Sequence, residues 1–221
     1  MNDATGLPEG WQRVPLHEVA EVRTGLAKGK QGLRDPVTLP YLRVANVQDG
    51  YFDLDEVKTI AVERADVERY ALRAGDVLMT EGGDFDKLGR GAVWGAQIPV
   101  CLHQNHVFVV RPHAGVLDAH YLSALSASAH GRNYFMGCAK RSTNLASINS
   151  SQLKAFPVLL PPIEEQRAMA RLFGVWDEAI DLHERELVRL RKEKAALMHD
   201  LISGRRRVPS HRLRDEEPAG A

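Results

Sequence analysis

Two patterns of apolar residues divide the chain near residue 161. Before this point, Gly, Pro, Asn and Asp interrupt short apolar runs about every ten residues, a pattern typical of strands joined by turns. After it, Pro and Gly become rare until Gly204. The pattern predicts a globular, strand-rich domain followed by one long helix and a tail.

Strands are expected in four runs of the first part, namely residues 41–47, 76–80, 91–94 and 106–112. The first is closed by the turn signal Gln48-Asp49-Gly50, and the last stops at Pro112. Residues 118–136 instead show a spacing of three to four between apolar positions, which favours a helix. The domain is therefore predicted to be mixed rather than all-β.

The long helix has clear start and stop signals. Pro161 and Pro162 precede Glu164 and Glu165, so proline stands at the first turn and acidic side chains stand near the positive end of the helix dipole. Gly204 follows Ser203 as a stop signal, and three arginines come directly after it. We predict a helix of about 60 Å between these points.

A spacing of 3.5 residues runs along this helix. Eight of its ten positions are apolar, with His183 and Lys194 as the exceptions. Such a stripe predicts a coiled-coil seam, which needs a partner helix because one helix cannot bury its own stripe. The alternative is a helix packed on its own domain. The predicted partner-helix residues are Met169, Phe173, Trp176, Ile180, Leu187, Leu190, Leu197 and Leu201.

The predicted fold class is α+β, with three parts. Residues 1–160 form a mixed, strand-rich domain, and residues 161–204 form a coiled-coil helix for spacing or dimerisation. Residues 205–221 form a charged tail that is expected to be disordered.

Composition narrows the class of protein further. Among 221 residues, 29 basic side chains balance 29 acidic ones, which argues against a histone-like general polyanion binder. Cys101 and Cys138 stand far apart without a CxxC pair, so neither a disulfide framework nor a metal site is expected. Because no export signal or membrane span is evident, we expect a cytoplasmic protein.

Several sequence segments contain residues that suggest catalysis, but their spacing does not match a known catalytic or metal-binding motif. The glycine-rich segment 82–91 lacks the Gly-Lys-Ser/Thr ending of a phosphate loop, and its acidic residues do not match a calcium loop. His103 and His106 have no evident third metal ligand. Glu56 and Lys58 are typical of some nucleases, but so short a signal arises often by chance. We expect no catalysis and no bound cofactor in this chain.

Three polar loops carry donors suited to phosphates and base edges. The first spans residues 24–34, the second is the glycine-rich segment, and the third spans residues 140–144. Glycine lets a backbone approach a groove, cations meet phosphate or guanine, and amides can pair with adenine. For any one residue a solvated surface loop is the alternative. The candidate DNA-binding residues are Lys28, Lys30, Arg34, Lys87, Arg90, Gln104, Asn105, Lys140, Arg141, Thr143 and Asn144.

The order of segments resembles the specificity subunit of type I restriction-modification systems, with one target-recognition domain and one conserved-region helix. The proline pair followed by Glu-Glu-Gln and the closing Leu-Ile-Ser-Gly are the most specific matches. The matching segments are residues 7–11 with 15–20, 41–47 with Gly50, 72–80, 103–106, 144–149, 160–166 and 201–205.

One departure from the family stands out. Its members usually carry two recognition domains and two long helices in one chain, whereas this chain has one of each and looks like a half subunit. The resemblance implies that two copies pair through the helix into a homodimer that reads a two-part site in double-stranded DNA. It also implies methyltransferase subunits that bring S-adenosylmethionine and, in systems that cleave DNA, a restriction subunit that uses ATP and Mg²⁺.

Other classes of function stay open at this point. One is a DNA-recognition module of a solitary modification or phage-defence system with a different partner enzyme. Another is a nuclease that uses Glu56 and Lys58, and a third is a coiled-coil adaptor with no sequence preference for DNA.

Overall fold

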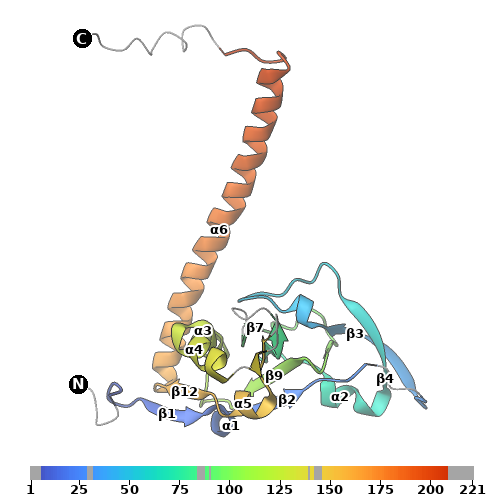
Figure 1. Ribbon diagram of the computed structural model, residues 1–221, viewed down its shortest axis with the longest axis vertical. Helices are drawn as coiled ribbons and strands as arrows, with labels where there is room; N and C mark the ends of the chain where they lie inside the picture. The colour runs from blue at the N-terminus through green and yellow to red at the C-terminus, as the bar shows by residue number, and fades with distance from the viewer. Residues whose placement is uncertain are drawn as a thin grey trace. The chain divides into compact units, whose positions relative to one another are not determined.

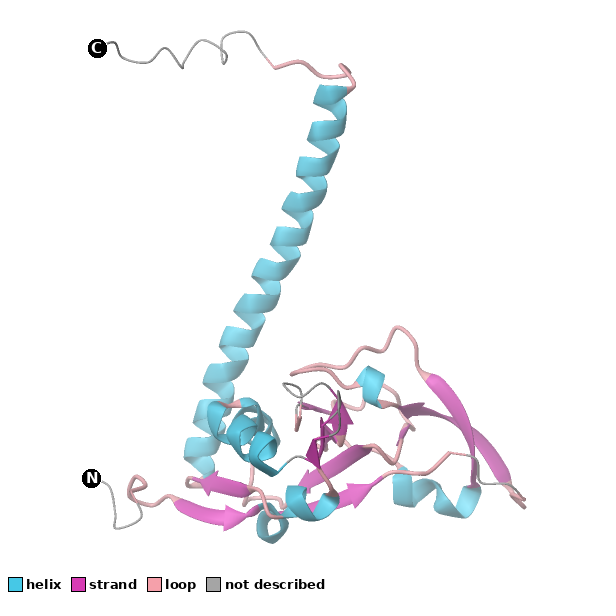
Figure 2. Cartoon of the chain, viewed as in Figure 1, coloured by secondary structure: helices cyan, strands magenta, loops and turns pink. Residues whose placement is uncertain are grey.

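The computed structural model describes residues 6–28, 32–83, 88–89, 91–138, 140–141 and 146–208, with the backbone alone at residues 83, 140, 141 and 146 (Figure 1). It divides into two compact units, Met1–Arg171 and Leu172–Ala221. The first unit contains several small sheets and short helices, and a long C-terminal helix follows (Figure 2). The predicted α+β class with a long helix is therefore confirmed.

The first unit is organised around a four-stranded antiparallel sheet in the order β2-β9-β5-β7. It confirms the three predicted strands between residues 76 and 112. Its strands are β2 (Ala20–Thr24), β5 (Val77–Thr80), β7 (Gly91–Val93) and β9 (Val107–Pro112).

The two central strands, β5 and β9, are buried on both faces of this sheet. Alternate side chains of a strand point to opposite faces. Val77 and Met79 accordingly join the main core with Phe135 and Leu153, whereas Leu78 joins a second core around Trp94. Burial on both faces explains why the sequences of both strands are continuous runs of mostly apolar residues.

Three smaller sheets surround the central one. A β4-β3-β8 sheet covers a third apolar cluster, β1 pairs with β12, and β10-β11-β6 forms a short three-stranded sheet. Their strands are β1 (Gln12–Pro15), β3 (Pro36–Leu42), β4 (Lys58–Glu63), β6 (Gly82–Gly83), β8 (Leu102–His103), β10 (Lys140–Arg141), β11 (Ala146–Ser147) and β12 (Pro157–Leu160).

The strand predicted at residues 41–47 ends early. β3 stops at Leu42, and the 3-10 helix η1 (Val44–Asn46) follows. The buried Asn46 amide accepts from the Arg43 N–H and donates to the carbonyls of Asp53 and Glu56. Such local side-chain bonds compete with a sheet ladder, so the chain turns where β-propensity alone favours a strand.

The helix predicted at residues 118–136 is two helices, α3 (Ala119–Ala127) and α4 (Ala129–Cys138). Ser128 between them has an extended backbone, and its Oγ accepts from the Gly131 N–H. Serine at such a position caps a new helix rather than continuing the old one. The other short helices are α1 (Leu16–Val19), η2 (Arg64–Asp66), α2 (Val67–Tyr70) and α5 (Ser150–Lys154).

Helix α6 (Ile163–Ile202) is 40 residues long, or about 60 Å. Its predicted end is confirmed, because Gly204 adopts a positive φ of 74° and its N–H bonds to the Leu201 carbonyl. At its other end Gln166 is fully buried, and Met169 packs partly against the main core. Among the described residues, no helix is both long and apolar enough to cross a membrane.

Candidate nucleic-acid interface

A turn at residues 103–106 connects the base of the first predicted loop to β8. The Leu26 N–H donates to the His103 carbonyl at 3.0 Å, and the Asn105 N–H donates to the Leu26 carbonyl at 3.0 Å. A Cβ on Gly25 would lie 2.2 Å from the His103 carbonyl oxygen. The two backbones can therefore approach this closely only because residue 25 is glycine.

The same turn also contacts the base of the second loop. The Glu81 N–H donates to the His106 carbonyl at 3.0 Å, and the Glu81 carbonyl accepts from the Ile148 N–H at 2.8 Å. The Glu81 carboxylate also pairs with Nδ1 of His106. Residue 81 thus links the turn to the segment that follows the third loop.

The short sheet β10-β11-β6 completes this connection. Gly82 and Gly83 pair with β11, and β11 pairs in turn with β10. These strands are the ends of the second and third predicted loops. We name the connected backbone at residues 25–26, 81–83, 103–106, 140–141 and 146–148 the loop junction.

The predicted DNA-binding residues differ in where they lie. Lys28 is exposed, with its Nζ 5.8 Å from the centre of the Tyr41 ring. Gln104 and Asn105 lie in the junction, half-buried, and their amides make no side-chain hydrogen bond within the described part of the chain. Lys140 and Arg141 belong to β10, with only their backbone described. Lys30, Lys87, Arg90, Thr143 and Asn144 lie outside the described residues.

Arg34 is not brought to the loop junction. It is exposed beside the start of β3, where its N–H donates to a Glu63 carboxylate oxygen at 3.0 Å. The junction contacts the opposite end of β3, where Leu42 pairs with His103. The seven residues of β3 form an extended strand, so its two ends lie about 20 Å apart.

His103 has a structural role at the centre of the junction. Its side chain is buried, and Nδ1 donates to the Val107 carbonyl at 2.7 Å. Burial lowers the pKa of this imidazole from 6.5 to about 4, so the ring is neutral at pH 7. Among the described residues, no three His, Cys, Asp or Glu side chains gather where they could hold a metal ion.

We expect the free energy of unfolding to fall as the pH is lowered from 6.5 to 4. In this window the unfolded chain protonates His103 while the folded chain does not, so acid favours unfolding. The full effect corresponds to about 3 kcal/mol between pH 7 and pH 4. Urea unfolding at both pH values measures it.

The His103→Asn variant is the control for this prediction, because asparagine keeps an N–H donor for Val107 and does not titrate. Between pH 7 and pH 4 the free energy of unfolding of the variant should fall by about 3 kcal/mol less than that of the parent. Equal losses in the two proteins would show that His103 is not the group responsible.

Glu56 and Lys58 do not assemble a nuclease site. The Glu56 carboxylate pairs with Lys58 and with Arg43, each at 3.6 Å. Both contacts satisfy charge on an exposed surface, and the acidic residues nearby do not form a metal-binding group within the described chain.

The second candidate surface lies on α6 within the unit from Leu172 onward. Most of the predicted stripe is exposed there, including Trp176 at 65% and Ile180 at 53%. A line of six exposed apolar side chains is typical of a surface that binds a partner, although other exposed apolar side chains of the helix, such as Val175 and Leu182, lie outside this line. The six are Phe173, Trp176, Ile180, Leu187, Leu190 and Leu197.

Comparisons with known proteins agree on one family. Residues 8–192 match the model described as the type I restriction modification DNA specificity domain. The chain is 29% identical over 199 residues to the putative type I restriction enzyme MjaX specificity subunit of Methanocaldococcus jannaschii, covering 89% of this chain and 46% of that protein. It is 26% identical over 180 residues to the EcoKI specificity subunit of Escherichia coli, covering 75% and 38%.

A solved structure shows the same fold. The HsdS subunit from Thermoanaerobacter tengcongensis superimposes with a TM-score of 0.57 at 18% identity, over 88% of this chain and 45% of that one. The chain spans about half the length of the relatives that it matches.

Proposed function

Because the chain belongs to the type I restriction-modification DNA specificity family, we propose that its first unit reads one half of a two-part site in double-stranded DNA. The observation that supports this most is the loop junction. It joins the ends of three loops with basic and amide side chains, and it leaves the Gln104 and Asn105 amides without side-chain partners among the described residues. Such amides can read base edges in a major groove.

The chemistry in this proposal belongs to partner subunits, and the chain is a non-catalytic specificity component. Methyltransferase subunits supply S-adenosylmethionine and flip the target adenine for N6 methylation. A restriction subunit, where present, uses ATP and Mg²⁺ to cleave unmodified DNA. The neutral charge of this chain fits that division, since partners can provide much of the phosphate affinity. In this proposal the chain acts in the cytoplasm, because its DNA target and its partner enzymes are there.

The second half-site is read by a second copy of the chain in this proposal. The exposed stripe of α6 is self-complementary in an antiparallel pair, and a twofold axis would bury it on both helices. Two copies would then present two recognition units, and the paired helices would fix the spacing between the half-sites.

Methylation sequencing of the source genome, with and without this gene, tests the proposal. We expect N6-methyladenine at a two-part motif to disappear when the gene is deleted. A palindromic motif is the result expected of two identical chains, and unequal halves would contradict the homodimer. If no methylated motif depends on the gene, the proposed specificity role is wrong.

A further inference from the structure

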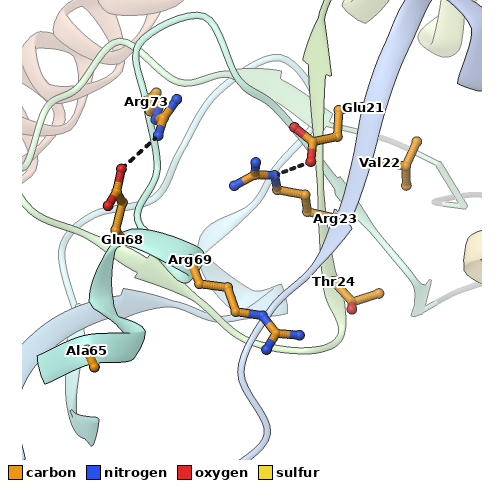
Figure 3. Close-up of a pocket in the computed structure, with 8 residues that line it drawn as sticks. All are labelled: Glu21, Val22, Arg23, Thr24, Ala65, Glu68, Arg69 and Arg73. Carbon is orange, nitrogen blue, oxygen red and sulfur yellow. Dashed lines mark ion pairs between the residues drawn. The ribbon is translucent and has the colours of Figure 1, made fainter. Parts of the chain in front are cut away.

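A polar hollow of about 620 Å³ lies between β2 and the segment that contains α2 (Figure 3). Three arginines and two glutamates line it, together with a threonine hydroxyl. None of these side chains is among the candidate DNA-binding residues named above. The lining residues are Glu21, Val22, Arg23, Thr24, Ala65, Glu68, Arg69 and Arg73.

The two carboxylates do not balance the three guanidinium groups. Arg23 pairs with Glu21 at 2.8 Å, and Arg73 pairs with Glu68 at 3.6 Å. Arg69 is exposed and makes no ion pair with the described residues, and its guanidinium carbon lies 5.3 Å from the centre of the Tyr70 ring. The lining therefore carries one excess positive charge.

The side chains are arranged so that the hollow attracts an anion. Arg23 extends from β2 and Arg69 extends from α2 on the opposite wall, each toward the space between them (Figure 3). Arg23 is compensated by Glu21, whereas Arg69 makes no ion pair with the described residues, so an anion that enters this space would meet one uncompensated positive charge. Arginine suits phosphate in particular, because its planar fork can bind two oxygens at once.

The positive charges around the hollow also lower the pKa of Glu21. Its pKa is lowered first by the hydrogen bond from Arg23, and then by the charges of Arg23, Arg111 and Arg73. Arg111 is itself held by Asp76, whose carboxylate accepts two hydrogen bonds from it at 2.7 and 2.8 Å. The Glu21 carboxylate thus stays ionised beside Arg23 and leaves Arg69 as the uncompensated cation.

The hollow borders the candidate nucleic-acid interface. Thr24, the last residue of β2, lines the hollow and directly precedes Gly25 and Leu26 of the loop junction. A group bound in the hollow would lie next to the base of the first basic loop.

We propose that Arg23 and Arg69 hold a phosphate of the DNA backbone in this hollow, beside the bases that the loops read. The proposal rests on the proposed function and adds a contact that positions the duplex without reading sequence. Arg69 is the residue to test, because its removal breaks no ion pair among the described residues.

The test compares the full chain with its Arg69→Gln variant by fluorescence anisotropy over a salt series. Two duplexes are used: a random sequence, and the motif found by methylation sequencing. We expect Arg69→Gln to weaken binding to both duplexes by the same factor, about three- to tenfold, and to lower the salt slope by about one. Arg69→Lys should recover only part of the loss, because lysine keeps the charge but not the fork. Arg132→Gln on α4 is the matched control and should change neither quantity.

The outcomes separate this proposal from the function on which it rests. If the parent chain binds neither duplex even when the methyltransferase subunits are present, the proposed DNA-reading function fails. If the parent binds and Arg69→Gln binds equally well, the phosphate contact is wrong while the function stands. A loss confined to the motif duplex would assign Arg69 to base reading and overturn a backbone contact. If inorganic phosphate raises the melting temperature through Arg69 while DNA affinity is unchanged, the ligand is a free anion and not DNA.

Discussion

We expect the double variant Ile180→Asp, Leu187→Asp to be monomeric, with its first unit folded. Both side chains are about half exposed on the stripe of α6, and neither belongs to the apolar clusters of the first unit. In a symmetric dimer each substitution is present twice, so four apolar contacts are lost. At about 1.5 kcal/mol each this is at least about 6 kcal/mol, or about 10⁴-fold in the dimer dissociation constant. Sedimentation equilibrium measures the change in mass.

A matched control distinguishes loss of the stripe from a general effect of added charge. Val188 is 49% exposed on the same helix, but it lies about 100° around the axis from Leu187. Val188→Asp should therefore remain dimeric. If the stripe variant keeps the dimer mass, or if Val188→Asp loses it equally, the pairing surface lies elsewhere on the chain. Circular dichroism of each variant checks that the fold is retained.

Local patterns predicted the parts of the fold that depend on near neighbours in the sequence. The long helix, its proline start and its Gly204 stop were predictable because capping and periodicity act within one or two turns. The two central strands, β5 and β9, were predictable because burial on both faces leaves a run of apolar residues. The break at Ser128 was missed, because a single hydroxyl decides whether one helix continues or a second begins.

The candidate site depends on long-range contacts that spacing cannot predict. The sequence identified three basic loops, but their bases meet only through pairs such as Leu26 with His103 and Glu81 with Ile148. The hollow shows this more clearly, because Arg23 and Arg69 belong to separate segments, and no local pattern predicts that these segments lie side by side. The spacing of Arg69 and Arg73 by four residues was the one available signal, and it is common on solvated surfaces.

Gln166 shows how a motif can be recognised before its physical role is known. The sequence pattern identified the Glu-Glu-Gln segment as a match to the family and as the start of a helix, but it predicted no contact for Gln166. In the structure it is fully buried, and its side-chain oxygen accepts from the Asp118 N–H at 2.9 Å. Its side-chain nitrogen donates to the carbonyls of Val116 and Pro161 at 3.0 and 2.8 Å. One amide thus ties the start of α6 to β12 and to the segment that precedes α3.

We expect Gln166→Leu to lower the free energy of unfolding of the first unit by about 4 kcal/mol. Leucine fills a similar volume but leaves the Pro161 carbonyl, which is buried, and two partly buried groups without this partner. An unsatisfied buried group costs about 1–3 kcal/mol, and a partly buried one costs less. Chemical denaturation followed by tryptophan fluorescence measures the loss, because Trp94 is buried in the same unit.

Glu164→Leu is the control for this substitution. Glu164 occupies the same first turn of α6, but its side chain is 76% exposed and, among the described residues, pairs with Arg167 alone at the surface. Its replacement should change stability by less than about 0.5 kcal/mol. Equal effects of the two variants would mean that helix propensity, rather than the buried amide, determines how α6 begins. A large loss for Gln166→Leu alone would instead show that this amide fixes the first turns of the helix to the first unit.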